Sequence, residues 1–307
     1  MNRSKIIGST ALASVMAASA AHAEMSISGL FAGTLADSDG GGLASGFSTN
    51  SIYVNYSDSM DNGMGVAVAM SLADGGNITT GVSFDTGMGT IGLGEAQDSA
   101  MDKNDGSPAC YSIILCGAAY STYTATAADQ DTITNADGYL DGDVPSGNSI
   151  SYTNTLGGIG IHVTRGMEDA TYDPVMSYAV SGSIMGATIK AGTSIIDFKA
   201  AATADRDPTF VTVAYSLAGL NLGYAAYDSD NGTEETQMGV GTSMMGMDVG
   251  VTIAESDAAT DVDFMRVSAS KSLGAASFGV DFTETDSELA SNADDSDAWQ
   301  FTYVVGF

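Results

Sequence analysis

The stretch that decides the fold is Trp299-Gln-Phe-Thr-Tyr-Val-Val-Gly-Phe307. Large apolar residues, most of them aromatic, alternate here with Gln, Thr, Val and Gly. In an extended chain successive side chains point to opposite sides, so one side of this segment is almost wholly aromatic. A period of two residues therefore predicts a β-strand with one apolar face and one small or polar face.

The same alternation recurs along the chain after residue 23. It is clear at 66–72, 159–163, 247–253 and 278–282, where the interleaved residues are mostly small or polar. The 307 residues include only 4 prolines, which suits long strand ladders, because proline has no amide hydrogen to donate. Such strands fit either a half-buried antiparallel sheet or the wall of a barrel between lipid and water.

The spacing of the connections separates these two possibilities. Short turn signals alternate with longer, acidic connections. The short turns lie at 60–64, 85–89, 155–158, 183–186, 216–219, 243–246 and 270–274, and the long connections at about 37–48, 73–77, 97–147, 166–176, 197–208, 228–235, 255–263 and 284–297. Seven short turns and eight long connections predict a 16-stranded antiparallel transmembrane β-barrel, with all short turns on one side. A soluble β-sandwich or surface-layer protein is the alternative.

The charge of the chain excludes several classes of function. Acidic residues number 38 and basic residues 9, giving a formal net charge of −29, although only 15% of residues are charged. Nucleic-acid binding through phosphates needs a basic surface that nine cations do not supply. A hydrophobic content of 44% argues against a disordered chain. With only His22 and His162 available, we expect no histidine-based catalysis and no enzyme.

The first 23 residues are expected to be an export signal. Arg3 and Lys5 precede a small and apolar stretch, and Ala21-His-Ala23 has the small-x-small pattern of a signal-peptidase site. Cleavage there would leave a mature domain at 24–307. No later stretch approaches the ~18 uninterrupted apolar residues that a transmembrane helix needs.

These features together resemble the trimeric diffusion porins of Gram-negative outer membranes. The shared features are an export signal, 16 expected strands, a very long third loop and the terminal Trp-x-Phe-x-Tyr-x-Val-x-Phe pattern. The resemblance implies an outer-membrane location, a homotrimer, contact with outer-membrane lipid and lipopolysaccharide, and a third loop folded into the lumen. It also implies that Trp299, Phe301, Tyr303 and Phe307 are the signal that the outer-membrane assembly machinery reads.

The width of such a barrel suggests its function. Barrels of about 16 strands leave an aqueous channel, so we expect passive diffusion of small hydrophilic solutes and ions, with no cofactor. The third connection, about 97–147, is the candidate constriction loop. Its acidic residues are Asp98, Asp102, Asp105, Asp129, Asp131, Asp137, Asp141 and Asp143, with Lys103 as its only base. Inside a channel these carboxylates would act on a permeating ion through a focused field.

The opposite wall departs from the porin pattern. Many such porins face the acidic loop with several arginines on the early strands, whereas residues 24–97 contain no Lys or Arg here. The remaining candidates for the pore wall are Lys190, Arg266, His162 and Arg165. Alternation points the first three into the lumen and Arg165 outward, at a strand end. We therefore expect a cation-selective pore.

Cys110 and Cys116 are the two cysteines, and both lie in the third connection. The chain is expected to enter an oxidising compartment, which favours a disulfide between them over two free thiols. The apolar run 111–115 is an alternative start for an extra hairpin, which would make 18 strands.

Two acidic segments have carboxylates at calcium-loop spacing. They are Asp37-Ser-Asp39 and Asp228-Ser-Asp-Asn-Gly232, and neither continues into the EF-hand pattern. Turn formation by Asp and Asn is the favoured interpretation. Weak Ca²⁺ binding at acidic loops stays open, and no other metal or cofactor is expected.

Two further functions stay open at this point. One is a non-transport surface protein, an adhesin or structural barrel whose acidic loops meet partners outside the cell. The other is a substrate-specific channel.

Overall fold

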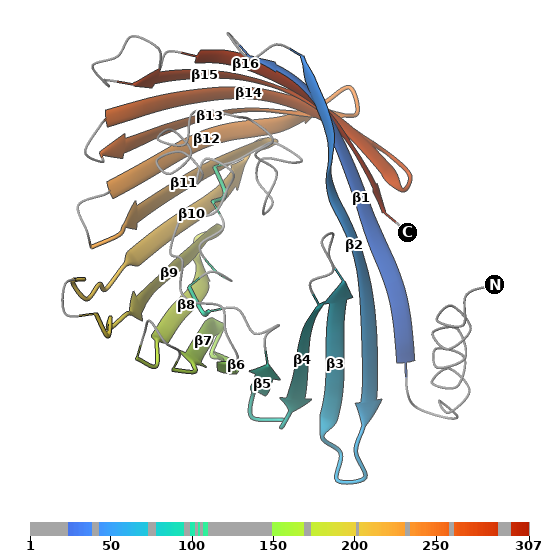
Figure 1. Ribbon diagram of the computed structural model, residues 1–307, viewed down its shortest axis with the longest axis vertical. Coiled ribbons are helices and arrows are strands. Elements are labelled where there is room, and N and C mark those ends of the chain that lie inside the picture. The colour runs from blue at the N-terminus through green and yellow to red at the C-terminus, as the bar shows by residue number, and fades with distance from the viewer. Residues whose placement is uncertain are drawn as a thin grey trace.

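The computed structural model describes residues 24–38, 43–72, 78–94, 99–101, 104, 107–109, 149–168, 173–200, 203–230, 234–257, 261–287 and 296–306. The expected export signal at 1–23 lies outside them. The described strands each pair antiparallel with their sequence neighbours, and β1 pairs with β16, so the sheet closes into a barrel (Figure 1). Among the described residues no helix is long and apolar enough to cross a membrane.

The 16 strands predicted from the sequence are confirmed. They are β1 (Glu24–Ser38), β2 (Ala44–Ser59), β3 (Gly65–Leu72), β4 (Ile78–Asp85), β5 (Thr90–Gly94), β6 (Ser149–Leu156), β7 (Ile159–Gly166), β8 (Met176–Ile184), β9 (Ala187–Ile195), β10 (Thr209–Leu217), β11 (Leu220–Asp228), β12 (Glu234–Met244), β13 (Met247–Asp257), β14 (Asp261–Leu273), β15 (Ala276–Ser287) and β16 (Ser296–Gly306). The run 111–115, the alternative start of an extra hairpin, lies outside the described residues.

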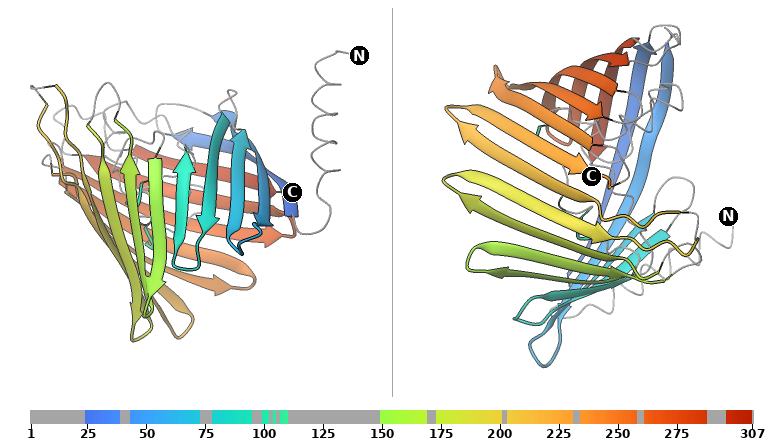
Figure 2. Two further views of the ribbon diagram at one scale, coloured as in Figure 1. Left: turned by 90° about the horizontal axis from the view of Figure 1, so that it is seen from below. Right: turned by 90° about the vertical axis from the view of Figure 1, so that its left-hand side faces the viewer.

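The short turns link the strands where the sequence predicted them, and Figure 2 shows hairpin turns gathered at one end of the barrel. Three of these turns have the same backbone form. Met185, Ala218 and Met245 have φ of 52°, 52° and 55°, and the glycines that follow have φ of 85°, 85° and 72°. Two successive residues with positive φ are typical of the type I′ turn, whose twist matches that of the flanking strands.

The first long connection is shorter than expected. We placed a connection at about 37–48, but β1 continues to Ser38 and β2 already begins at Ala44. The pairing of the two strands shifts register between Ala32 and Gly33. The start of β2 has a single large apolar residue, Phe47, so backbone pairing with β1 forms this part of the strand without an apolar alternation.

The wall has an apolar outer face and a polar inner face. On β16, Trp299 and Phe301 are each 38% exposed, whereas Gln300 and Thr302 between and after them are 4% and 0% exposed. β13 and β14 repeat this pattern, with Val251, Ile253, Met265 and Val267 exposed and Thr252, Arg266 and Ser268 buried. This is the alternation expected of a barrel whose outer face meets lipid.

A close contact lies where the barrel closes. Tyr303 of β16 is the direct partner of Gly33 of β1. An ideal Cβ on Gly33 would lie 2.5 Å from both Cζ and the hydroxyl oxygen of the Tyr303 ring. The ring therefore occupies the space that a side chain at residue 33 would need, as when an aromatic residue covers a strand glycine.

Candidate functional site: the inner wall of the barrel

The described part of the third connection lies against the inner wall. It comprises 99–101, 104 and 107–109. The Met101 amide donates a hydrogen bond to the Ser177 hydroxyl at 2.8 Å, and the Ser194 hydroxyl lies 3.5 Å from the Met101 sulfur. Ser177 on β8 and Ser194 on β9 both belong to the buried polar face. The chain that follows β5 therefore runs inside the barrel at this point.

An apolar cluster holds this segment in place. Ala100 and Met101 are both fully buried in it. Its other members are Val175, Ala179, Ile196, Phe210, Ala225 and Tyr227, with Phe198 packed against them. Burying a side chain such as that of Met101 contributes roughly 1.5–3 kcal/mol. Part of the inner wall of β8 to β11 is therefore covered by apolar packing.

Asn104 connects the third connection to β7. Its Nδ2 donates to the Ala100 carbonyl at 2.7 Å and lies 3.2 Å from Nδ1 of His162. A carbonyl only accepts, so this atom is the amide NH₂ and His162 Nδ1 is the acceptor. The ring proton then sits on Nε2, which lies 3.3 Å from the Thr164 hydroxyl. His162 is buried between these two partners, at 7% exposure.

Pro108 and Ala109 cross a row of small residues on β11, β12 and β13. Gly223 is the direct partner of Gly239, and Gly239 is the partner of Thr252. A Cβ on Gly223 would overlap the Pro108 carbonyl, and a Cβ on Gly239 would overlap the Ala109 carbonyl. The Thr252 hydroxyl donates to the Ala109 carbonyl at 2.7 Å. We call Gly223, Gly239 and Thr252 together the loop seat.

The candidate cations lie at different places on the wall. Arg266 of β14 is the direct partner of Thr252, is 4% exposed and therefore borders the loop seat. Lys190 of β9 pairs with Thr212, shares the inner face and is half-buried. Arg165 is exposed on the outer side of β7, near its end at the long connection.

The inner wall also carries two buried carboxylates that sequence reasoning did not single out. Asp281 of β15 is 1% exposed and pairs with Ser268. Ser268 is the next inward-facing residue after Arg266 on β14. Glu235 of β12 is 3% exposed and accepts a hydrogen bond from Gln237 Nε2 at 2.7 Å. Acidic groups therefore lie on the inner face of the strands themselves.

Other candidates lie outside the described residues. These are Asp98, Asp102, Asp105, Asp129, Asp131, Asp137, Asp141, Asp143, Cys110, Cys116 and Phe307. The disulfide and the acidic constriction remain predictions.

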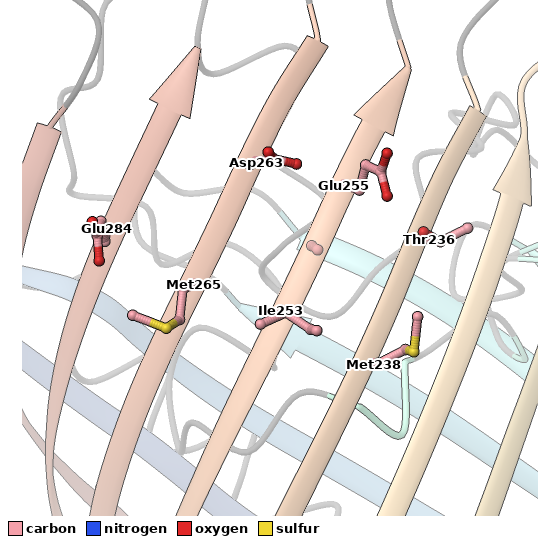
Figure 3. Close-up of a pocket in the computed structure, with 8 residues that line it drawn as sticks. Thr236, Met238, Ile253, Glu255, Asp263, Met265 and Glu284 are labelled. Atoms are coloured by element: carbon pink, nitrogen blue, oxygen red, sulfur yellow. The ribbon is translucent and has the colours of Figure 1, made fainter.

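A pocket on the outer surface shows how far the strands reach (Figure 3). It is lined by Thr236, Met238, Ile253, Ala254, Glu255, Asp263, Met265 and Glu284. We assigned Glu255 and Asp263 to a connection at 255–263, but β13 continues to Asp257 and β14 begins at Asp261. The two carboxylates are direct cross-strand partners on the outer face. Glu255 and Asp263 lie beyond the apolar outward residues of these strands, because the pairing of β13 with β14 continues past those residues.

The segment Asp228–Gly232 contains carboxylates that bind backbone groups. Asp228 Oδ1 accepts from the Asp230 amide at 2.8 Å, and Asp230 Oδ2 accepts from the Asp207 amide at 2.9 Å. These bonds agree with the turn-forming interpretation. Within the described ranges, no group of three or more His, Cys, Asp or Glu side chains is arranged to hold a metal ion.

Comparison with solved structures shows the same fold. An anion-selective porin from Comamonas acidovorans has a TM-score of 0.64 at 12% identity, covering 93% of this chain and 100% of that one. The trimer form of OmpT, an outer membrane protein of Vibrio cholerae, has a TM-score of 0.66 at 12% identity, covering 94% and 100%. A mutant of the Rh. blastica porin has a TM-score of 0.65 at 14% identity, covering 92% and 100%.

No curated protein matches the sequence. The model of the family described as Gram-negative porin matches residues 8–306, nearly the whole chain. Together with the closed barrel, this match shows that the chain belongs to the Gram-negative porin family and forms a non-enzymatic diffusion channel of the outer membrane.

Proposed function

We propose that the channel prefers cations to anions. The observation that carries the proposal is the balance of charge on the inner face of the described strands. By alternation, the inner carboxylates are Glu24, Asp85, Glu235, Asp248 and Asp281, and the inner cations are Lys190 and Arg266. In a water-filled space bounded by low-dielectric walls, an excess of fixed negative charge raises the local concentration of cations.

The third connection adds to this field. Residues 99–109 enter the barrel where they are described. Of the eight aspartates of the connection named above, Asp98, Asp102 and Asp105 lie within or next to this segment in sequence, and the other five follow from residue 129 onward. We assign all eight aspartates to the border of the narrowest part of the channel.

The test is a reversal potential in a planar bilayer under a KCl gradient. A cation-selective channel shifts the potential toward the value for K⁺. The fold alone does not decide the sign, since one porin of this fold is described as anion-selective. A reversal potential with the sign of Cl⁻ selectivity would contradict the proposal.

The assembly proposed is a homotrimer. β3 and β4 have 8 residues each and β5 has 5, fewer than the ~9–11 that a strand needs to span the hydrocarbon core. A neighbouring copy packed against β3, β4 and β5 would shield these short strands from lipid. OmpT of the same fold has a trimer form. Electrophoresis without boiling should show a trimer-sized band that becomes monomeric on heating, and a monomer-sized band before heating would contradict the trimer.

A further inference from the structure

The β12–β13 hairpin carries three exposed methionines around one turn. Met244 ends β12, Met245 lies in the turn and Met247 begins β13. Their exposed fractions are 53%, 91% and 41%. None of the three side chains contributes to a protein core, so packing within the chain does not explain why methionine stands at all three positions.

The hairpin brings the three side chains together. Met244 and Met247 are direct cross-strand partners, so their side chains share one face and their Cβ atoms lie about 4.5–5.5 Å apart. Met245 has a φ of 55°, in the left-handed region that residues other than glycine adopt at a cost. Met245 directly follows Met244 in the chain, so all three thioethers belong to the same hairpin turn.

Hydrogen bonds hold this hairpin in its form. The Ser243 hydroxyl donates to the Asp248 carboxylate across the two strands. The Thr242 hydroxyl donates to the Gly219 carbonyl at 2.9 Å, which ties the hairpin to the neighbouring turn. Asp248 and Ser243 lie on the inner face, opposite to the methionine pair. The three thioethers therefore stand on a hairpin that is ordered before any ligand arrives.

Two other hairpins of the barrel provide an internal comparison. Their turns have the same backbone form, at Met185-Gly186 and Ala218-Gly219. The residues flanking those turns are Ile184 and Ala187 in one, and Leu217 and Leu220 in the other. In these two hairpins, branched aliphatic or small residues occupy the positions that correspond to Met244 and Met247. Contact with lipid at these positions therefore does not require methionine.

We propose that Met244, Met245 and Met247 form a binding site for a soft monovalent cation, Cu⁺ or Ag⁺. Thioether sulfur is a soft, neutral ligand that prefers Cu⁺ over the hard cations, which bind oxygen. Thioethers carry no proton to lose, so their affinity for the ion does not depend on pH between 5 and 8. The site faces the short-turn side of the barrel.

The test is titration of the detergent-solubilised barrel with Ag⁺ in chloride-free buffer. Cys110 and Cys116 are replaced by serine in every sample, so that no thiol competes. The expected result is that Met244→Leu or Met247→Leu weakens the tightest Ag⁺ site at least tenfold, and that the triple leucine variant lacks it. Leucine keeps the face apolar, as at Leu217 and Leu220 of the comparison hairpin.

The matched control is Met185→Leu, which removes a 95% exposed methionine from a hairpin of the same form and should leave the site unchanged. Heat-modifiable migration in electrophoresis confirms that each variant is folded. Unchanged Ag⁺ binding in the triple variant would overturn the proposal. So would wild-type binding that excess Ca²⁺ abolishes or that disappears between pH 8 and pH 5, because carboxylates would then be the ligands.

Discussion

The hydroxyl of Thr252 donates a hydrogen bond to the carbonyl of Ala109 at 2.7 Å, across a separation of 143 residues in the sequence. Both residues are buried, with Ala109 fully so. The bond joins the third connection to the middle of β13, beside Arg266. Together with Ser177 and His162, this side chain of the wall holds the connection inside the barrel.

Replacing Thr252 with valine should loosen the third connection. Valine has nearly the same shape but no donor, so the Ala109 carbonyl loses this partner in a buried place, at a cost of about 1–3 kcal/mol. We expect single-channel records with more frequent transitions between conductance levels. Thr212→Val is the matched control, since Thr212 is a 2% exposed inner-face threonine without a side-chain hydrogen bond to the described part of the connection. Equal noise in both variants would contradict the prediction.

Gly239→Ala should displace the same segment by steric overlap. The added Cβ would overlap the carbonyl oxygen of Ala109, which is backbone and cannot swing aside. Overpacking of this kind costs typically about 1–3 kcal/mol. The expected results are a lower temperature of unfolding and a changed mean conductance. Gly182→Ala is the control, because its Cβ would meet only the Gly158 carbonyl at 3.9 Å. The prediction fails if the two variants unfold and conduct alike.

Much of the fold was predictable because one face of each strand is apolar. The alternation on β16 and the short turns such as Ser243–Gly246 together determined the strand number and which side chains face outward. The limits of β1 and β2 were not predictable in the same way. The start of β2 has no apolar period, and its extent depends on pairing with β1.

The candidate site was only partly predictable. Asp281 lies between Val280 and Phe282, so the alternation that points Arg266 inward also points Asp281 inward, and this signal was available. The loop seat could not be predicted from the sequence. Gly223 and Gly239 read as small inner-face residues, and their role depends on strand register and on a segment more than 100 residues earlier in the chain.

Barrel closure should be sensitive to Gly33. Alanine there would place a Cβ 2.5 Å from the Tyr303 ring, so either the ring or the β1–β16 pairing must shift. We expect Gly33→Ala to lower the temperature at which the folded band disappears in electrophoresis. Gly306→Ala lies at the same junction, where the Cβ would meet only the Gly29 carbonyl at 3.7 Å. It should behave as wild type, and an equal loss in both variants would show that the ring contact is not the cause.

Ion preference should respond to Lys190 and not to Lys271. Lys190 lies on the inner face of β9, whereas Lys271 of β14 pairs with the outward Phe278. Replacing either by glutamine removes one positive charge, but only Lys190→Gln removes it from the ion path. We expect Lys190→Gln to move the reversal potential in a KCl gradient further toward that of K⁺. The effect should shrink as salt rises, because the Debye length falls from about 10 Å at 0.1 M to about 3 Å at 1 M. If Lys271→Gln shifts the potential as much as Lys190→Gln, selectivity arises from the overall charge of the protein and not from the inner wall.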